Sequence, residues 1–170
     1  MRILVAGVGN IFCGDDAYGV EVASLLLRRR ALPASVVVKD FGIRGLDLAY
    51  ALTDGYDAAI IIDAAARGEE PGAISVVEPE RPETKSEAAQ TLLSSSHGLD
   101  PEKVLGLVAT LGAACERILF VLCEPLTLGD EEGQMGLSDV VAAAVEPSVE
   151  LVQRLVSSLL QHDETALGAC

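Results

Sequence analysis

Residues 2–20 read RILVAGVGNIFCGDDAYGV, and this stretch decides the fold. Its first part, Arg2–Ala6, is a short apolar run that predicts a buried β-strand. The following Gly7-Val8-Gly9-Asn10 predicts a tight turn. From Asp16 onward, apolar residues recur at helical spacing, and Asp15 and Asp16 stand where they can cap the exposed N–H groups at the start of that helix. The stretch therefore predicts a strand, an acidic loop and a helix in direct succession.

The same alternation of strands and helices continues along the chain. Apolar runs predict strands at Ser35–Lys39, Ala58–Ile62, Ile74–Val77 and Arg117–Cys123, and helical spacing predicts helices at Leu46–Leu52, Val104–Leu111 and Ser138–Leu160. Pro147 predicts a kink or a division in the last helix, and residues 162–170 are typical of a frayed tail. With no internal linker, residues 1–170 form one domain. We expect an α/β fold, a three-layer sandwich whose mostly parallel sheet of about five strands is covered by helices on both faces.

Composition and charge exclude several classes of partner. The formal net charge of −14 argues against a nucleic-acid partner, and the short basic run at residues 28–30 suits the negative end of a helix dipole. No apolar stretch approaches the length needed to span a bilayer, so no membrane partner is expected. The cysteines, Cys13, Cys115, Cys123 and Cys170, have no CxxC spacing and indicate reduced thiols. We therefore expect a soluble, cytoplasmic protein.

Acidic residues follow several of the predicted strands. Asp16, Asp40, Asp63 and Glu124 each come after a strand, and in open parallel sheets ligands bind beyond the carboxyl ends of the strands. Asp16, Asp63 and His97 form the sharpest candidate site. Two carboxylates and one imidazole favour a divalent transition metal, such as nickel, zinc or iron, over magnesium or calcium.

Each member of this candidate site also has a purely structural interpretation. Asp16 is a favoured residue type for a helix cap, and Asp63 is an ordinary carboxylate where a strand leaves the core. His97, in a Ser-rich loop, is as well explained by contact with solvent as by metal binding. These alternatives stay open on the residues alone.

Three segments carry a resemblance to a known family. The segment Ile3–Val20 resembles the N-terminal signature of the [NiFe]-hydrogenase maturation endopeptidases, which is a strand followed by Gly-x-Gly-Asn, Gly-Asp-Asp and Gly-Val. Ile60–Ala64 is similar to the family's second metal-ligand segment. Ser95–Leu99, followed by Val104–Leu107, is similar to the third. The resemblance covers nearly the whole chain, in the family's order.

The resemblance implies a specific activity. Members of the family remove a short C-terminal extension from the large-subunit precursor of a [NiFe] hydrogenase after nickel has been inserted. The family's metal ligands fall on Asp16, Asp63 and His97, which would make the protein a peptidase with aspartic-type residues and without a Ser or Cys triad. The implied partner is the precursor, and the implied metal is nickel that arrives with the substrate. No organic cofactor is implied.

The segment Asp40–Gly45 departs from the family pattern. Phe41 and Ile43 stand where many relatives carry Gly and Thr, and we expect both to reshape the surface that faces the substrate. Asp40 is a candidate catalytic residue beside Asp16, as a free acid that assists attack on the peptide bond. The alternative interpretation of Asp40 is a turn residue at the end of a strand.

Three other functions are compatible with parts of the sequence. Gly7-x-Gly9 after a strand resembles half of a dinucleotide-binding fingerprint, but Phe12 occupies the place of the third glycine. A hydrolase using Cys13, or Ser94–Ser96, with His97 lacks a positive neighbourhood for the thiolate and a GxSxG elbow for the serine. A non-catalytic chaperone that senses nickel would have the same ligands as the peptidase.

Overall fold

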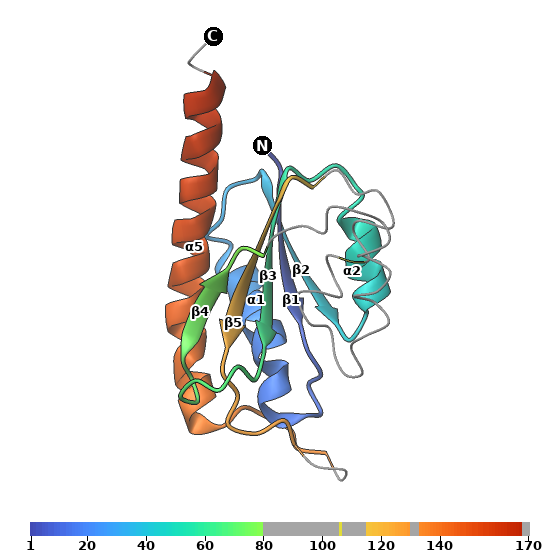
Figure 1. Ribbon diagram of the computed structural model, residues 1–170, viewed down its shortest axis with the longest axis vertical. Coiled ribbons are helices and arrows are strands. Elements are labelled where there is room, and N and C mark those ends of the chain that lie inside the picture. Colours follow the sequence, from blue (N-terminus) through green and yellow to red (C-terminus); the bar gives the residue numbers. More distant parts are fainter. Residues whose placement is uncertain (80–105, 107–114, 130–132, 168–170) are drawn as a thin grey trace.

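The structure, a computed structural model, describes residues 1–79, 106, 115–129 and 133–167, with backbone alone for 162–167. One sheet contains the strands β1 (Ile3–Val8), β2 (Val36–Gly42), β3 (Ala58–Ala64), β4 (Ile74–Val77) and β5 (Arg117–Cys123) (Figure 1). Their order across the sheet is β2-β1-β3-β5-β4, with β4 antiparallel to β5 and the other neighbours parallel. The predicted mostly parallel sheet of five strands is confirmed.

Helices cover both faces of this sheet. A 3₁₀ turn η1 (Gly14–Ala17) leads into α1 (Tyr18–Arg29), which packs with α5 (Asp139–Leu167) on one face, while α2 (Gly45–Ala51) packs on the other (Figure 1). The helix predicted at Val104–Leu111 lies outside the described residues except for Gly106, which is helical. None of the described helices combines the length and the apolar character that crossing a membrane requires.

The helix α5 differs from its prediction because it runs unbroken through Pro147 and on to Leu167, into the segment predicted to be a frayed tail. The predicted division at Pro147 is therefore wrong. Pro147 is exposed, whereas Val141 and Val149, on either side of it, are fully buried against the sheet. Burial of this apolar face on both sides of the proline outweighs the lost backbone hydrogen bond.

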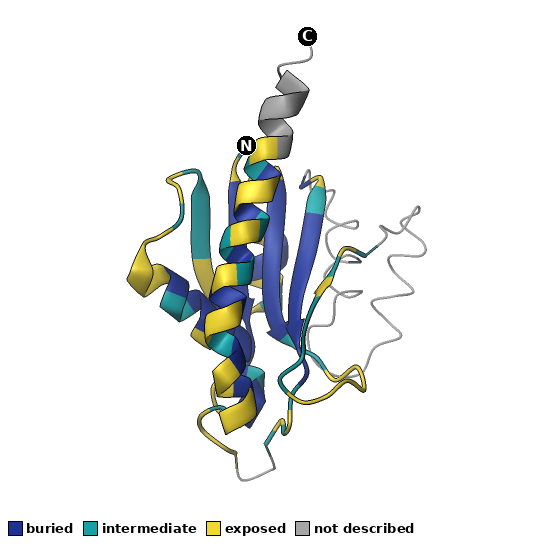
Figure 2. Ribbon diagram, turned by 90° about the vertical axis from the view of Figure 1, so that its left-hand side faces the viewer, coloured by how far each residue is buried: buried dark blue, intermediate teal, exposed yellow. Residues whose placement is uncertain are grey.

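The central strands are buried on both faces, which explains their continuous apolar runs. Along β1, Ile3 and Val5 contact the core beneath α1 and α5, while Leu4 and Ala6 contact the core beneath α2. Figure 2 shows these buried strands in dark blue behind the exposed face of α5. Side chains that alternate in direction thus build two cores from one sheet.

Glycines bring α1 into direct contact with the sheet. A Cβ atom on Gly19 would collide with the carbonyl oxygens of Ile62 and Val8, and one on Gly7 would collide with Gly19 and Ala23. The close approach that these glycines permit lays the start of α1 on the ends of β1 and β3. The residues just before α1 therefore lie beside the residue that follows Ile62.

Candidate active site

The carboxyl ends of four parallel strands share one edge of the sheet. Asp16 follows β1 in the turn η1, Asp40 lies near the end of β2, Asp63 lies in the last part of β3, and Glu124 directly follows β5. The sequence predicted this convergence of carboxylates, and the topology confirms that all of them lie at this edge. Their side chains, however, have very different surroundings.

Asp16 and Asp63 form a pair of interacting carboxylates. Asp63 is 8% exposed, and burial together with the nearby charge of Asp16 raises its pKa well above the usual range, against a hydrogen bond from its neighbour's backbone N–H. Burial also raises the pKa of Asp16, although the N–H of Asn10 donates to Asp16 Oδ2 at 2.7 Å. Neither carboxylate has an ion pair within the described residues. Two neighbouring carboxylates without a cationic partner repel each other, and a bound cation would reduce that repulsion.

The neighbouring Asp15 is held in the opposite manner. Its carboxylate is fully buried and accepts hydrogen bonds from the backbone N–H groups of Leu126, Thr127 and Ser138, and from the Ser138 hydroxyl. Burial alone would raise the pKa of Asp15, but these donors lower it below its usual value. Asp15 is thus ionised, and its carboxylate oxygens are already occupied by these donors. Of the two neighbouring acids, Asp16 is the one with fewer donors and is therefore the better candidate to bind a ligand.

The prediction that these acids cap the first helix is wrong. The N-cap of α1 is Ala17, and neither η1 nor α1 has a side-chain capping hydrogen bond. The chain enters α1 through a 3₁₀ turn, and Gly9, at φ +136°, lies so close to the carbonyl of Asp16 that a side chain would not fit. In this tight turn the Asp15 carboxylate binds the loop after β5, and the Asp16 carboxylate binds the backbone N–H of Asn10.

Asp40 lies in the last part of β2, and its polar groups are bonded to the residues where the strand ends. Its Oδ1 accepts the N–H of Gly42 at 2.8 Å, and its backbone carbonyl accepts a hydrogen bond from the Arg44 guanidinium at 2.7 Å. Asp40 is exposed and lines an open hollow of about 460 Å³ together with Asn10 and Phe12. Since Asn10 also donates to Asp16, this hollow adjoins the acid pair.

The two residues that depart from the family pattern have different positions. Ile43 is 72% exposed at the rim of the hollow, as expected for a residue that faces a substrate. Phe41 also lines the hollow, but it is almost completely buried and packs in the core beneath α2 with Leu48. Phe41 therefore contributes to the hollow although most of its ring packs in the core, and its effect on a substrate-facing surface stays a prediction.

The third predicted ligand, His97, lies outside the described residues. Within the described ranges, no group of three or more His, Cys, Asp or Glu side chains is placed to hold a metal ion. The structure therefore brings Asp16 and Asp63 together, and the role of His97 stays a prediction. Among the described cysteines, Cys13 and Cys123 are free thiols. Burial and the charges of Asp15 and Glu124 raise the pKa of Cys123 to about 11, which disfavours its thiolate.

Comparison with known proteins decides the family. A family model described as hydrogenase maturation protease matches residues 20–155, well over half of the chain. The chain belongs to the hydrogenase maturation protease family. It is 33% identical over 153 residues to the hydrogenase 2 maturation protease of Escherichia coli, covering 89% of this chain and 88% of that protein. It is also 31% identical to HupD, a hydrogenase expression/formation protein of Bradyrhizobium diazoefficiens, covering 92% of this chain and 78% of that protein.

Solved structures of this family have the same fold. The hydrogenase maturating endopeptidase HybD from Escherichia coli superimposes with a TM-score of 0.71 at 30% identity, covering 93% of each chain. A hydrogenase 2 maturation peptidase from a Thaumarchaeota archaeon superimposes with a TM-score of 0.69 at 30% identity, covering 92% of this chain and 99% of that one. The protein is thus a peptidase of hydrogenase maturation, which disfavours the dinucleotide-binding alternative.

Sequence reasoning did not find the role of Asp15. Its hydrogen-bond partners lie 111 to 123 residues away along the chain, and no local pattern connects them. The Gly-Asp-Asp motif marked both acids but did not distinguish their surroundings. That distinction depends on where the loop after β5 returns to the sheet edge.

Proposed function

We propose that this protein is the endopeptidase that removes the C-terminal extension of a [NiFe]-hydrogenase large-subunit precursor after nickel insertion. In this proposal Asp16, Asp63 and His97 recognise the nickel. The observation that carries it is the pair of carboxylates at the sheet edge: Asp63 is 8% exposed, burial and the charge of Asp16 raise its pKa, and neither acid has an ion pair in the described part of the chain.

A metal ion would relieve the repulsion between these carboxylates. Burial disfavours two adjacent negative charges, and a divalent cation between them replaces that repulsion with attraction. Binding would displace the proton that the raised pKa of Asp63 favours. Two carboxylate oxygens and one imidazole nitrogen suit nickel and leave coordination positions open. The nickel is cargo of the substrate, so the pair would read whether the precursor has been loaded.

The hydrolytic step requires a positioned peptide and an activated water. Nickel held by the precursor and by this pair would orient the extension peptide at the sheet edge. A water assisted by the metal, or by a free acid, would attack the scissile carbonyl. Asp40 is the proposed acid, because it is exposed and lines the hollow that adjoins Asp16.

The test is processing of a purified precursor with and without nickel. We expect the wild-type protein to cleave the nickel-loaded precursor, and Asp16→Ala, Asp63→Ala and His97→Ala each to lose cleavage. Normal processing by all three variants would refute the ligand set. Wild-type protein that binds the loaded precursor without cutting it would instead be a nickel-sensing chaperone.

A chelator arm tests where the metal comes from. If nickel arrives with the substrate, chelators added to the peptidase alone and then removed should leave its activity toward the loaded precursor unchanged. If chelators abolish cleavage of a precursor that lacks any metal, the peptidase has a metal of its own and this part of the proposal is wrong.

A further inference from the structure

The described parts of the segment after β5, residues 126–129 and 133–138, lie against the turn that contains Asp16. We call these parts the outer loop. The N–H of Gly14 donates to the carbonyl of Gln134 at 2.6 Å, and the N–H of Gln134 donates to the carbonyl of Phe12 at 2.9 Å. The turn at residues 9–16 and the outer loop thus lie side by side at the edge of the sheet.

The Asp15 carboxylate holds both ends of the outer loop. At its start, Asp15 Oδ2 accepts the N–H groups of Leu126 at 2.9 Å and Thr127 at 3.0 Å. At its end, Oδ1 accepts the N–H of Ser138 at 2.6 Å, and Oδ2 accepts the Ser138 hydroxyl at 2.9 Å. Hydrogen bonds to an ionised acceptor are stronger than those between neutral groups. One buried side chain therefore closes the outer loop and attaches it to the turn next to Asp16.

The outer loop presents apolar side chains to solvent. Leu126 is 60% exposed and Met135 is 74% exposed, and Phe12, whose carbonyl is bonded to the loop, is 57% exposed. A loop that served to cover the core would bury such side chains. Exposed Met and Phe side chains on a fixed backbone are typical of a surface that contacts another protein.

We propose that Asp15 is a positioning residue that holds the outer loop and the turn together as one apolar docking surface for the large-subunit precursor. This inference rests on the proposed function. A nickel site inside another protein reaches Asp16 only if that protein lies on this edge of the sheet. The precursor would then contact the apolar side chains that flank the turn, namely Phe12, Leu126 and Met135.

Three variants separate positioning from general stability. Asp15→Asn keeps the shape of the side chain but places an amide N–H₂ group or a weaker acceptor before three backbone donors. Ser138→Ala removes one donor and keeps the backbone contacts. The double variant Leu126→Gln with Met135→Gln changes exposed side chains alone and should keep the fold. It therefore tests the docking surface even if Asp15→Asn fails to fold.

The matched control is Glu124→Gln, at the start of the same connection. The Glu124 carboxylate also accepts backbone N–H groups, from Arg67 at 2.7 Å and Gly68 at 3.3 Å, but these belong to the loop after β3. This variant loosens the loop after β3 by the same chemistry, and that loop contains none of the proposed docking side chains.

The experiment measures binding and cleavage of the nickel-loaded precursor by each variant. We expect Asp15→Asn and the double variant to raise both Kd and KM about tenfold, the effect of losing one or two charge-assisted bonds or buried apolar contacts, with kcat changed less than about threefold. Ser138→Ala should have a smaller effect in the same direction, and Glu124→Gln should leave Kd and KM unchanged.

Two results would overturn the inference. One is precursor binding by the double variant, and by folded Asp15→Asn, at wild-type affinity. The other is an equal rise in KM for Glu124→Gln and Asp15→Asn, which would indicate general loosening. If the wild-type protein binds the precursor and does not cut it, the proposed function fails. The docking surface would still stand if Asp15→Asn and the double variant bind more weakly than wild type.

Discussion

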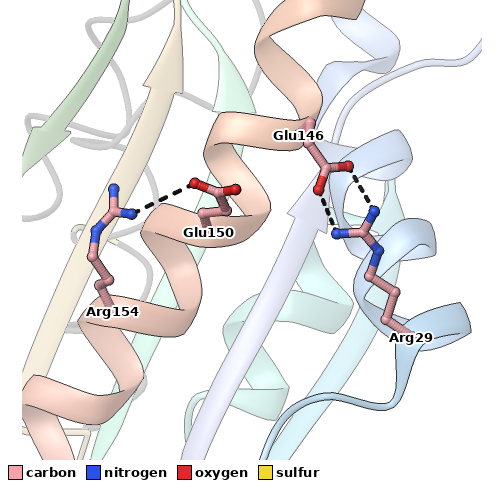
Figure 3. Close-up of polar contacts among 4 residues, drawn as sticks. All are labelled: Arg29, Glu146, Glu150 and Arg154. Carbon is pink, nitrogen blue, oxygen red and sulfur yellow. Dashed lines mark hydrogen bonds and ion pairs between the residues drawn. The ribbon is translucent and has the colours of Figure 1, made fainter.

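Two groups of carboxylates in this molecule have opposite surroundings. On the outer face of α5, Glu146 accepts two hydrogen bonds from Arg29, at 2.5 and 2.7 Å, and Glu150 lies 3.8 Å from Arg154 (Figure 3). At the carboxyl edge of the sheet, Asp16 and Asp63 lie near each other with no ion pair in the described ranges. The exposed glutamates are paired with arginines at the surface, where an ion pair contributes little to stability. Asp16 and Asp63 have no such partner in the described ranges, although an unpaired carboxylate is costly where it is shielded from solvent. Such an arrangement is what the proposed nickel-recognition site requires, because perturbed acids gather at functional sites.

The same contrast exists between two consecutive residues. Asp15 is surrounded by hydrogen-bond donors, which lower its pKa, whereas Asp16 faces another carboxylate and its pKa is raised. A change at Asp15 should therefore act mainly on stability and position, and a change at Asp16 mainly on activity. The predictions below test this separation, beginning with the largest effect.

The largest effect is expected from removing the charge of the acid pair. Asp16→Asn or Asp63→Asn should lower kcat/KM for the nickel-loaded precursor by at least about 100-fold, since even indirect partners of metal ligands change activity by 10- to 100-fold. The release of the extension peptide, followed by mass spectrometry, measures this rate. Glu146→Gln is the matched control and should process at the wild-type rate. Loss of activity in the control, or its retention in both Asn variants, contradicts the proposed site.

The next effect concerns stability at Asp15. Asp15→Asn should lower the free energy of unfolding by about 2–4 kcal/mol, because several buried N–H groups lose their acceptor or gain a poor one. Asp16→Asn should change it by less than about 1 kcal/mol, since its side chain accepts one backbone hydrogen bond. Urea denaturation of both variants gives the comparison. Equal destabilisation by the two changes would remove the distinction between a structural and a functional acid.

Asp63→Asn should stabilise the metal-free protein in a pH-dependent way. The folded-state pKa of Asp63 is raised well above the ordinary value of an aspartate carboxyl, so its contribution to stability is fully present below that ordinary value and is lost as the pH rises through the folded-state pKa. Asn cannot ionise and avoids this loss. We expect a gain of about 1–2 kcal/mol at pH 8 that shrinks toward pH 4. Denaturation curves across this range check the sign, and a gain that is the same at both pH values would contradict it.

The smallest effect is expected on the outer face of α5. Arg29→Ala should lower the free energy of unfolding by less than about 1 kcal/mol, because the pair with Glu146 is exposed and screened by solvent. High salt should reduce the difference further. A loss of several kcal/mol in the same denaturation assay would show that these exposed pairs hold α5 in place, and the contrast with the sheet edge would weaken.

The fold was readable from the sequence because its main signals are local. The apolar runs at β1 and β3, with Gly7 and Gly9 after the first of them, predicted the strands and the turn. The parallel topology then placed Asp16 and Asp63 at the same edge. These predictions depend on residues that are close together in the chain and on one general rule about parallel sheets.

The errors arose where distant contacts decide the local structure. Pro147 predicted a kink or a division of the last helix, but α5 is not divided there, because burial on both sides of the proline keeps the helix continuous. Asp15 was predicted to cap a helix, but donors more than 100 residues away bind its carboxylate instead. Phe41 was predicted to reshape the substrate-facing surface, and it does line the hollow, but the sequence did not show that most of its ring packs in the core beneath α2. The donors that bind Asp15 have no signal near it in the chain.

The position of a bound metal tests the central claim most directly. Crystals of the protein soaked with Cd²⁺, a surrogate for nickel with strong anomalous scattering, would locate the ion. We predict an anomalous peak between the carboxylates of Asp16 and Asp63, with the imidazole of His97 as the third ligand. An ion bound to a different set of side chains, or this pair left empty while Cd²⁺ binds elsewhere, would contradict the proposal that the protein recognises its substrate through that metal.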